Sequence, residues 1–118
     1  RGPRLSVTVH APTTIVTLAL TPAELPEGKV VSMTAGTLQV ALIREGETVH
    51  AFIDECPHGA ASFEGEQVRD GCVRCPLHGA LFELASGAPR KGPARQALTR
   101  LTVQRATSGH LTVELPTD

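Results

Sequence analysis

The sequence contains few aromatic residues and no long hydrophobic run. Among its 118 residues there are three Phe, no Trp and no Tyr, so we expect an aliphatic core built from short strands. No apolar stretch approaches the roughly 20 residues that a membrane-spanning helix requires. The formal net charge of -1 argues against a general nucleic-acid binder, because such a protein needs a basic surface to displace counterions from phosphates.

Cysteine is also scarce, and its count is odd. Of the three Cys residues, two lie in the motifs of Cys and His described below, which leaves no pair for an intramolecular disulfide framework. Proteins without structural disulfides are typical of reducing compartments. We therefore expect a cytoplasmic protein.

The length and the turn signals indicate one all-β domain. A chain of 118 residues buries about two thirds of its unfolded surface, which is enough for a single core. We expect an irregular N-terminal arm at 1–12 and a single domain over 13–118. Alternating and β-branched stretches predict strands at 14–20, 30–34, 38–44, 48–54, 80–83, 98–105 and 110–115, with a brief strand within 62–70. Short turns predict an antiparallel meander, with a helical turn at 21–24 and a Gly- and Pro-rich loop at 85–94.

Two motifs that contain Cys and His lie in the middle of the chain: Cys56-Pro57-His58-Gly59 and Cys75-Pro76-Leu77-His78-Gly79. Together they supply two thiolates and two imidazoles, the set that places two sulfurs on one iron and two nitrogens on the other in a 2Fe-2S centre. Two Cys and two His also suit a structural zinc site. Zinc ligand pairs are usually separated by two to four residues, whereas only one residue separates the first pair here, which favours the iron-sulfur centre.

The residues around these motifs extend the pattern to a known family. The segment 75–83 is similar to the second ligand box of Rieske-type ferredoxins, and both motifs carry the Pro and Gly that flank the ligands in that family. Further segments sit where the family has them: 25–28, 49–52, 63–65, Gly87 and 93–94. The resemblance covers roughly residues 13 to 115. It implies an antiparallel β-sandwich or partial barrel, with a small cluster-binding subdomain of two loops at about 55–83.

The resemblance also implies one 2Fe-2S cluster per chain. Its four ligands would be two thiolates on the inner iron and two imidazoles on the outer iron, from Cys56, Cys75, His58 and His78. Four further residues would lie around the cluster: Gly59, Leu77, Gly79 and Pro89. The two glycines would let backbone amides approach the cluster sulfurs, and the proline would shield one side.

Departures from the family pattern indicate its low-potential branch. High-potential members carry an extra Cys in each box, joined in a disulfide, and the matching positions here hold Ala61 and Leu77. Those members also direct a Ser and a Tyr hydroxyl at the cluster, where this chain has Ala80 and Phe82. Each missing donor leaves more negative charge on the reduced cluster uncompensated, so we expect a midpoint potential of about -150 mV.

The implied function is one-electron transfer, without catalysis of bond chemistry. The resemblance points to a soluble monomeric carrier that takes electrons from a flavin reductase to a terminal oxygenase, with no nucleic-acid partner and no membrane span. The sequence has no second set of two His and one carboxylate at the spacing of an oxygenase iron centre. Two alternatives remain open: a small subunit of a larger oxidoreductase, of the nitrite reductase type, and a zinc-stabilised binding module.

Three further features carry weaker signals. Cys72 is expected to be a small buried residue on its strand. His50 fits a strand residue with a hydrogen-bonding role better than a ligand. Arg90, Lys91 and Arg95 place three cations on or beside the Pro-rich loop, either as solvated residues or as a rim that steers an acidic partner.

Overall fold

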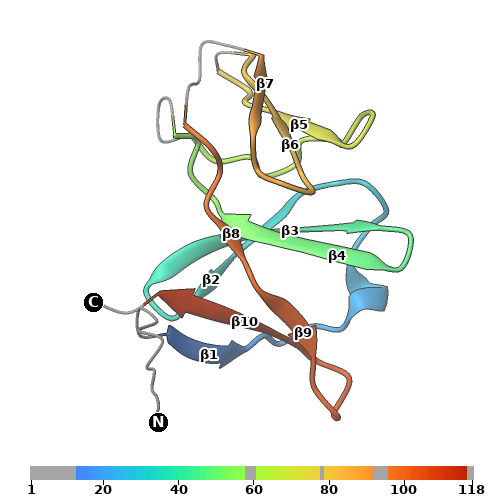
Figure 1. The fold of residues 1–118 in the computed structure, drawn as a ribbon. Helices are drawn as coiled ribbons and strands as arrows, with labels where there is room; N and C mark the ends of the chain where they lie inside the picture. The colour runs from blue at the N-terminus through green and yellow to red at the C-terminus, as the bar shows by residue number, and fades with distance from the viewer. Residues whose placement is uncertain (1–12, 58–60, 78, 92–95, 117–118) are drawn as a thin grey trace, which may run out of the picture.

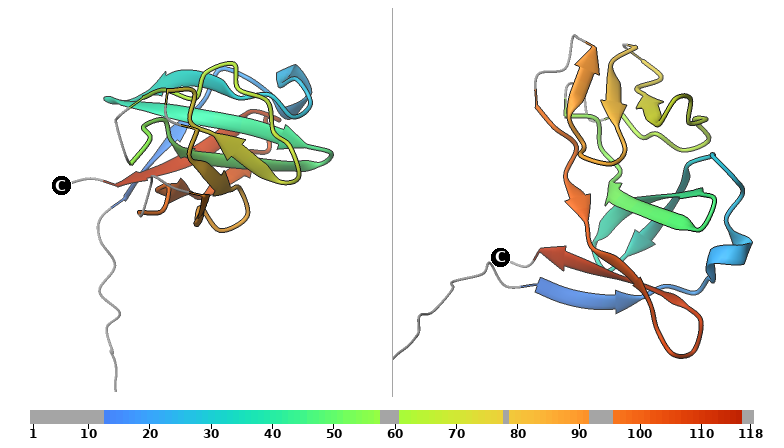
Figure 2. Two further views of the ribbon diagram at one scale, coloured as in Figure 1. Left: turned by 90° about the horizontal axis from the view of Figure 1, so that it is seen from above. Right: turned by 45° about the vertical axis from the view of Figure 1, so that its right-hand side comes forward.

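Three small antiparallel sheets follow one another along the molecule (Figure 1). The structure is a computed structural model that describes residues 13–57, 61–77, 79–91 and 96–116. The predicted arm at 1–12 lies outside these residues. Two further views show the same order, with the sheet that carries the second Cys motif at one end and the sheet that contains both ends of the described chain at the other (Figure 2).

The middle and lower sheets combine strands that are separated in the sequence, whereas the upper sheet consists of three consecutive strands. The upper sheet has the order β5-β6-β7, the middle sheet β2-β3-β4-β8 and the lower sheet β1-β10-β9. The elements are β1 (Thr13–Thr17), the 3-10 turn η1 (Pro22–Glu24), β2 (Val31–Ala35), β3 (Leu38–Glu45), β4 (Thr48–Ile53), β5 (Cys72–Arg74), β6 (Leu81–Glu83), β7 (Pro89–Lys91), β8 (Arg100–Leu101), β9 (Val103–Arg105) and β10 (Leu111–Pro116). All pairs of named strands are antiparallel, which confirms the predicted fold class.

Several element boundaries differ from the predicted ones. The strand predicted at 98–105 is two strands, because the chain leaves β4 of the middle sheet after Leu101 and joins β10 of the lower sheet from Val103. The first strand ends at Thr17 and not at residue 20. No named strand forms within 62–70, where the chain makes only isolated bridges. The helical turn at η1 is confirmed, and the carboxylate of Glu24 accepts a hydrogen bond from the amide of Thr21 at 2.7 Å.

The loop predicted at 85–94 is also wrong in part, because it contains β7. The proline that begins this strand is compatible with it, since β7 is an edge strand and a missing N–H there breaks no internal ladder. A register irregularity at Leu81 and Phe82 of β6 accommodates the pairing with β7. Of the Gly and Pro residues in the predicted loop, Gly87 lies in the turn before the strand and Pro89 begins the strand itself, while Gly92 and Pro93 lie outside the described residues.

The middle sheet is buried on both faces. In β3 the run 40–43, Val-Ala-Leu-Ile, is fully buried, as expected for a strand covered on two sides. Because side chains alternate along a strand, Val40 and Leu42 enter one core while Ala41 and Ile43 enter the other. The lower core comprises Leu18, Leu25, Ala35, Val40, Leu42, Ala51, Leu101, Leu111, Val113 and Leu115. The upper core comprises Val30, Ala41, Ile43, Phe52, Cys56, Phe63, Val73, Cys75, Ala80, Phe82, Leu84 and Leu98.

All three Phe side chains lie in the upper core. The ring of Phe63 meets the ring of Phe52 edge-on at a centroid distance of 5.4 Å, and that of Phe82 at 5.9 Å. Such edge-to-face contacts add stabilisation beyond the area they bury. The scarce aromatic residues are thus concentrated in the core that also contains the two motif cysteines.

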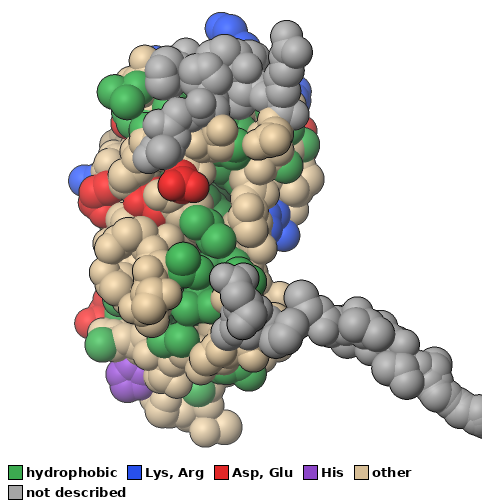
Figure 3. Space-filling model, turned by 90° about the vertical axis from the view of Figure 1, so that its left-hand side faces the viewer, with side chains coloured by type: hydrophobic (Ala, Val, Ile, Leu, Met, Phe, Trp, Pro, Cys, Tyr) green, Lys and Arg blue, Asp and Glu red, His purple; other side chains and the backbone are tan. Residues whose placement is uncertain are grey.

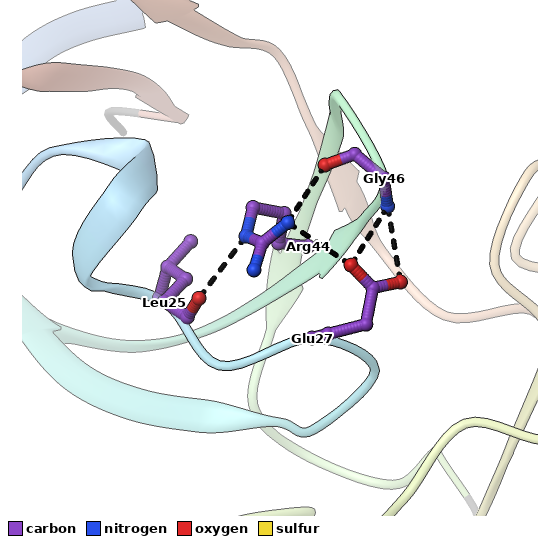
Figure 4. A network of polar contacts seen from close by, with 4 residues as sticks. All are labelled: Leu25, Glu27, Arg44 and Gly46. Atoms are coloured by element: carbon purple, nitrogen blue, oxygen red, sulfur yellow. Dashed lines mark hydrogen bonds and ion pairs between the residues drawn. The ribbon is translucent and has the colours of Figure 1, made fainter.

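A polar network fixes the segment that precedes β2 (Figure 4). The guanidinium group of Arg44 donates to the carbonyl of Leu25 at 3.0 Å, to the carboxylate of Glu27 at 3.0 Å and to the carbonyl of Gly46 at 2.9 Å. The amide of Gly46 donates back to both oxygens of Glu27 at 3.0 Å. The family-like segment 25–28 therefore serves to hold the chain against the β3–β4 turn.

Candidate metal centre

Two of the four predicted ligands come together in the upper core. Cys56 lies shortly after β4 and Cys75 lies directly after β5, and both side chains are essentially inaccessible to solvent. They belong to one cluster of buried residues. The other two predicted ligands, His58 and His78, lie outside the described residues, as does Gly59.

The two loops that begin at these cysteines close in the same way. The amide of Cys56 donates to the carbonyl of Ala61 at 2.9 Å, and the amide of Cys75 donates to the carbonyl of Ala80 at 2.8 Å. Each bond spans five positions, so the ligand loops 56–61 and 75–80 have equal length although their His residues differ in position. Each loop consequently places its cysteine at the same point relative to its closing bond.

Gly79 is required by the backbone of the second loop. Its φ is +75°, a conformation that residues with a Cβ rarely adopt, and its amide donates to the carbonyl of Cys75 at 2.9 Å. Apart from Gly79 itself and its chain neighbours, no atom of the described residues lies within 4 Å of the point where a Cβ would stand. Conformation alone is thus sufficient reason for glycine here.

The remaining predicted residues of the site lie on the upper sheet or at its edge. Leu77 is 70% exposed within the second loop, which makes it one of two large hydrophobic side chains that the described residues expose. Pro89 is half-buried on β7 and pairs with Phe82 of β6. The side chains of Ala80 and Phe82, at the positions where high-potential relatives carry hydroxyls, are fully buried.

Asp54 is a site residue that the sequence reasoning missed. This residue is 6% exposed and lies between the end of β4 and Cys56. One of its carboxyl oxygens accepts a hydrogen bond from the amide of Phe63 at 2.7 Å, and the other accepts one from the hydroxyl of Ser62. An acidic residue that follows a strand and precedes the first motif was the available signal.

Cys72 is not the buried residue that was predicted. It is only partly buried on β5, where it pairs with Glu83 of β6. The alternation of side chains explains the difference, because Val73 occupies the inward position and its neighbours Cys72 and Arg74 point to the other face. His50, by contrast, has the predicted hydrogen-bonding role, since its Nε2 lies 2.9 Å from the carboxylate of Glu45.

The outer face of the upper sheet carries a basic groove. Its charged lining residues are four cations and two carboxylates: Arg69, Arg74, Arg90, Lys91, Glu66 and Asp70. Strand register aligns Arg74, Leu81 and Lys91 in one row across β5, β6 and β7. On another side of the molecule, acidic side chains gather above a hydrophobic patch and basic ones lie at the margins of the view (Figure 3). Charge is therefore unevenly distributed around the protein.

One carboxylate of this sheet has a perturbed pKa. A hydrogen bond from the hydroxyl of Ser86 lowers the pKa of Glu83, and the guanidinium group of Arg90 lowers it further. The ion pair between Arg90 and Glu83 also means that Arg90 is only partly available as a surface cation. Arg95, the third cation of the predicted rim, lies outside the described residues.

The described part of the site fits a cluster that takes two sulfur ligands. Two loops of equal length each bring one cysteine into a shared apolar core, and the sequence places one His on each loop. Within the described ranges no group of three or more His, Cys, Asp or Glu could hold a metal ion, since two of the predicted ligands lie beyond those ranges. In the same ranges, no helix is long and apolar enough to cross a bilayer.

Comparison with known proteins identifies the family. Residues 16–105 match the Rieske [2Fe-2S] domain. The chain belongs to this family. Its cofactor is accordingly a 2Fe-2S cluster. This Rieske chain is 34% identical to the anthranilate 1,2-dioxygenase ferredoxin subunit of Burkholderia cepacia, over 78% of this chain and 84% of that subunit.

Solved structures of Rieske proteins share the fold. The ferredoxin in the complex of reduced oxygenase and oxidized ferredoxin of carbazole 1,9a-dioxygenase superposes with a TM-score of 0.71 at 26% identity, over 79% of this chain and 95% of that one. A protein assigned as the small subunit of an NADH-dependent nitrite reductase from Mycobacterium tuberculosis gives a TM-score of 0.76 at 23% identity, over 91% and 99%. The second likeness supports the fold alone.

Proposed function

We propose that this Rieske protein is the one-electron carrier of a multicomponent dioxygenase and that it delivers electrons to the terminal oxygenase. The observation that carries the proposal is the similarity to a dioxygenase ferredoxin subunit over most of both chains, together with the two buried cysteines on matched loops. A bound 2Fe-2S cluster gains and loses one electron at a time. The chain itself supplies the ligands, excludes water and presents a surface to its partners.

The proposed ligands are the thiolates of Cys56 and Cys75 and the imidazoles of His58 and His78. The upper core surrounds both cysteines with apolar side chains, which keeps water away from the sulfur side of the site. Exposed Leu77 adjoins His78 in the sequence and offers an apolar contact for a partner close to the proposed ligand. Apolar contacts at the centre of an interface contribute more than charged contacts at its rim.

We further propose that a flavin reductase is the electron donor and that the protein works in the cytoplasm. Two of three cysteines are assigned to the cluster, which leaves no disulfide framework that an oxidising compartment would favour. We also propose that the basic groove on the upper sheet receives an acidic surface of a redox partner. Complementary charge there would raise the association rate more than the affinity.

The test is reconstitution with a purified reductase and a purified terminal oxygenase from the host organism. We expect NADH-dependent substrate oxidation only when the purified carrier is added, and none with Cys56→Ser. Full turnover in the absence of this chain would rule out the carrier function.

The nitrite reductase type of subunit is the second candidate, because the sequence leaves it open and such a subunit shares the fold. A permanent subunit would co-purify in fixed ratio with a larger reductase chain. A carrier would elute alone and exchange between partners. Size-exclusion chromatography of the endogenous protein from its host separates the two functions.

A further inference from the structure

The two ligand loops close alike but rest on different supports. The second loop joins β5 to β6, and backbone pairing of Arg74 with Leu81 continues the ladder directly from its closing bond. The first loop has a strand only on its incoming side, since β4 ends at Ile53 and no named strand follows within 62–70. Its outgoing side lacks the ladder that supports the second loop.

On the outgoing side of the first loop, hydrogen bonds to the side chain of Asp54 provide the support that strand pairing gives the second loop. Its two carboxyl oxygens accept hydrogen bonds from the amide of Phe63 and the hydroxyl of Ser62, across the base of the loop from Cys56. The amide of Asp54 is itself held at 2.9 Å by the carbonyl of Gln39 on β3. The carboxyl group therefore links the middle sheet to the first residues beyond the loop.

The residues that Asp54 contacts are themselves anchored. The hydroxyl of Ser62 also accepts a hydrogen bond from the amide of Glu64 at 3.1 Å, and the carboxylate of Glu64 accepts one from the amide of Ser32 on β2 at 2.6 Å. The ring of Phe63 is held edge-on between two other Phe rings. Ser62 and Phe63 are thus held by other residues as well. A shift of Asp54 would therefore change the distance between Cys56 and these two residues.

Burial makes this arrangement specific. A buried polar group that loses its partners costs on the order of 1–3 kcal/mol, whereas a satisfied network fixes one geometry. Within the described residues, Asp54 and His50 are the only buried polar or charged residues. Both of its oxygens are directed at the same two-residue segment beyond the ligand loop.

We propose that Asp54 is a positioning residue for the cluster: its carboxyl group fixes the spacing between Cys56 and the segment Ser62–Phe63 at the base of the first ligand loop, and so sets where the sulfur of Cys56 is presented. The inference rests on the proposed ligand set. It is independent of which protein donates or receives the electron. Loss of the two hydrogen bonds of Asp54, here called the Asp54 clamp, should loosen the Cys56 side of the site. The second loop should stay in place on its β-hairpin.

The experiment compares Asp54→Ala, Asp54→Asn and Ser62→Ala in the cluster-loaded protein. Asn keeps an oxygen for the Phe63 amide, and Ser62→Ala removes only one of the two bonds. We expect Asp54→Ala to broaden the electron paramagnetic resonance spectrum of the reduced protein and to lose its cluster about tenfold faster, as other changes around metal ligands do. The two milder variants should fall between it and the wild type.

Val113→Ala is the matched control, because this residue is buried in the lower core, whereas Cys56 and Cys75 belong to the upper core. It should lower the unfolding temperature while leaving the spectrum and the rate of cluster loss unchanged. The proposal is overturned when Asp54→Ala has the wild-type spectrum and loses its cluster no faster than Val113→Ala. Should Asp54→Ala fail to fold, wild-type behaviour of both milder variants overturns it. Retention of iron by Cys56→Ser would instead refute the ligand set, independently of the clamp.

Discussion

The backbone carbonyl of Leu98 lies 2.9 Å from the point where a Cβ on Gly87 would stand. The φ of Gly87 is +80°, its amide donates to the carbonyl of Glu83 at 2.7 Å, and its carbonyl accepts from the amide of Leu98 at 2.8 Å. This contact joins the β6–β7 turn of the upper sheet to the segment that leads into the middle sheet. The family-like glycine therefore holds the cluster-bearing end of the protein against the rest.

Replacing Gly87 by Ala should consequently destabilise the protein more than the same change at an open turn. Gly46 is the control, since it has a φ of +62° and no atom within 4 Å of a Cβ position. The left-handed conformation alone should cost Gly46→Ala about 1–2 kcal/mol. The added overlap with a backbone carbonyl should raise the loss for Gly87→Ala by about 1–3 kcal/mol more. Denaturant unfolding of the cluster-loaded variants measures both losses in the free energy of unfolding. Equal losses for the two variants would contradict the contact between Gly87 and Leu98.

Iron content tests the ligand assignment. Cys56→Ser and Cys75→Ser should each lose the red-brown colour, the iron and the acid-labile sulfide, because a 2Fe-2S cluster does not survive without one of its thiolates. Cys72→Ser should retain all three, since Cys72 lies on the opposite face of β5 from the upper core. Zinc in place of iron in the native protein would show that the cluster assignment is wrong.

The midpoint potential should lie at the low end of the Rieske range, about -150 mV. A hydroxyl introduced by Ala80→Ser or Phe82→Tyr should raise it, because a donor stabilises the more negative reduced state. A donor that favours reduction by about 1.4 kcal/mol shifts a one-electron potential by about 60 mV. Protein-film voltammetry measures the shift. A wild-type value above about +100 mV would contradict the low-potential branch.

Charge reversal tests docking at the basic groove. The double variant Arg74→Glu and Lys91→Glu reverses two exposed cations of one cross-strand row, whereas Arg105→Glu on β9 reverses one cation on the lower sheet. We expect the double variant to slow electron transfer with the redox partner about tenfold at low salt and to weaken its salt dependence. Arg105→Glu should have little effect. A slowing by Arg105→Glu in proportion to its smaller change in net charge would show that only net charge matters.

The pKa of Glu83 should depend on both Ser86 and Arg90. The hydrogen bond from Ser86 is the largest single cause that lowers this pKa, and Arg90 lowers it through both a hydrogen bond and its charge. A carboxylate with a lowered pKa in the folded state stabilises the fold above its unfolded pKa, and this contribution is lost as the pH falls through the folded pKa. Ser86→Ala and Arg90→Gln should each raise the NMR titration midpoint of the Glu83 carboxyl carbon. An unchanged midpoint in either variant would contradict the assignment.

Much of the site could be predicted because its chemistry is local in the sequence. Each motif holds its Cys, its His and its flanking Pro and Gly within a few residues. The types of metal ligand and the need for glycine could therefore be predicted from the sequence. The placement of Cys56 and Cys75 in one buried cluster agrees with that interpretation. The turn signals likewise gave the all-β class and the hairpins of the middle sheet.

Features that depend on contacts between distant segments were not predictable. The strand β7 forms because β6 offers it an edge, although its own residues suggest a loop. The exposure of Cys72 follows from which face of β5 meets the upper core. The two faces of β3 enter different cores only because sheets from other parts of the chain cover both sides.

The sequence by itself determined which atoms are proposed as ligands of the iron and that short strands would carry them. Only the tertiary structure decided that the carboxyl group of Asp54 would hold the segment that follows the first loop, where strand pairing holds the segment that follows the second. The reason is physical: a motif specifies donors along the chain, whereas a buried hydrogen bond exists only once the fold has placed both partners together and removed the water between them.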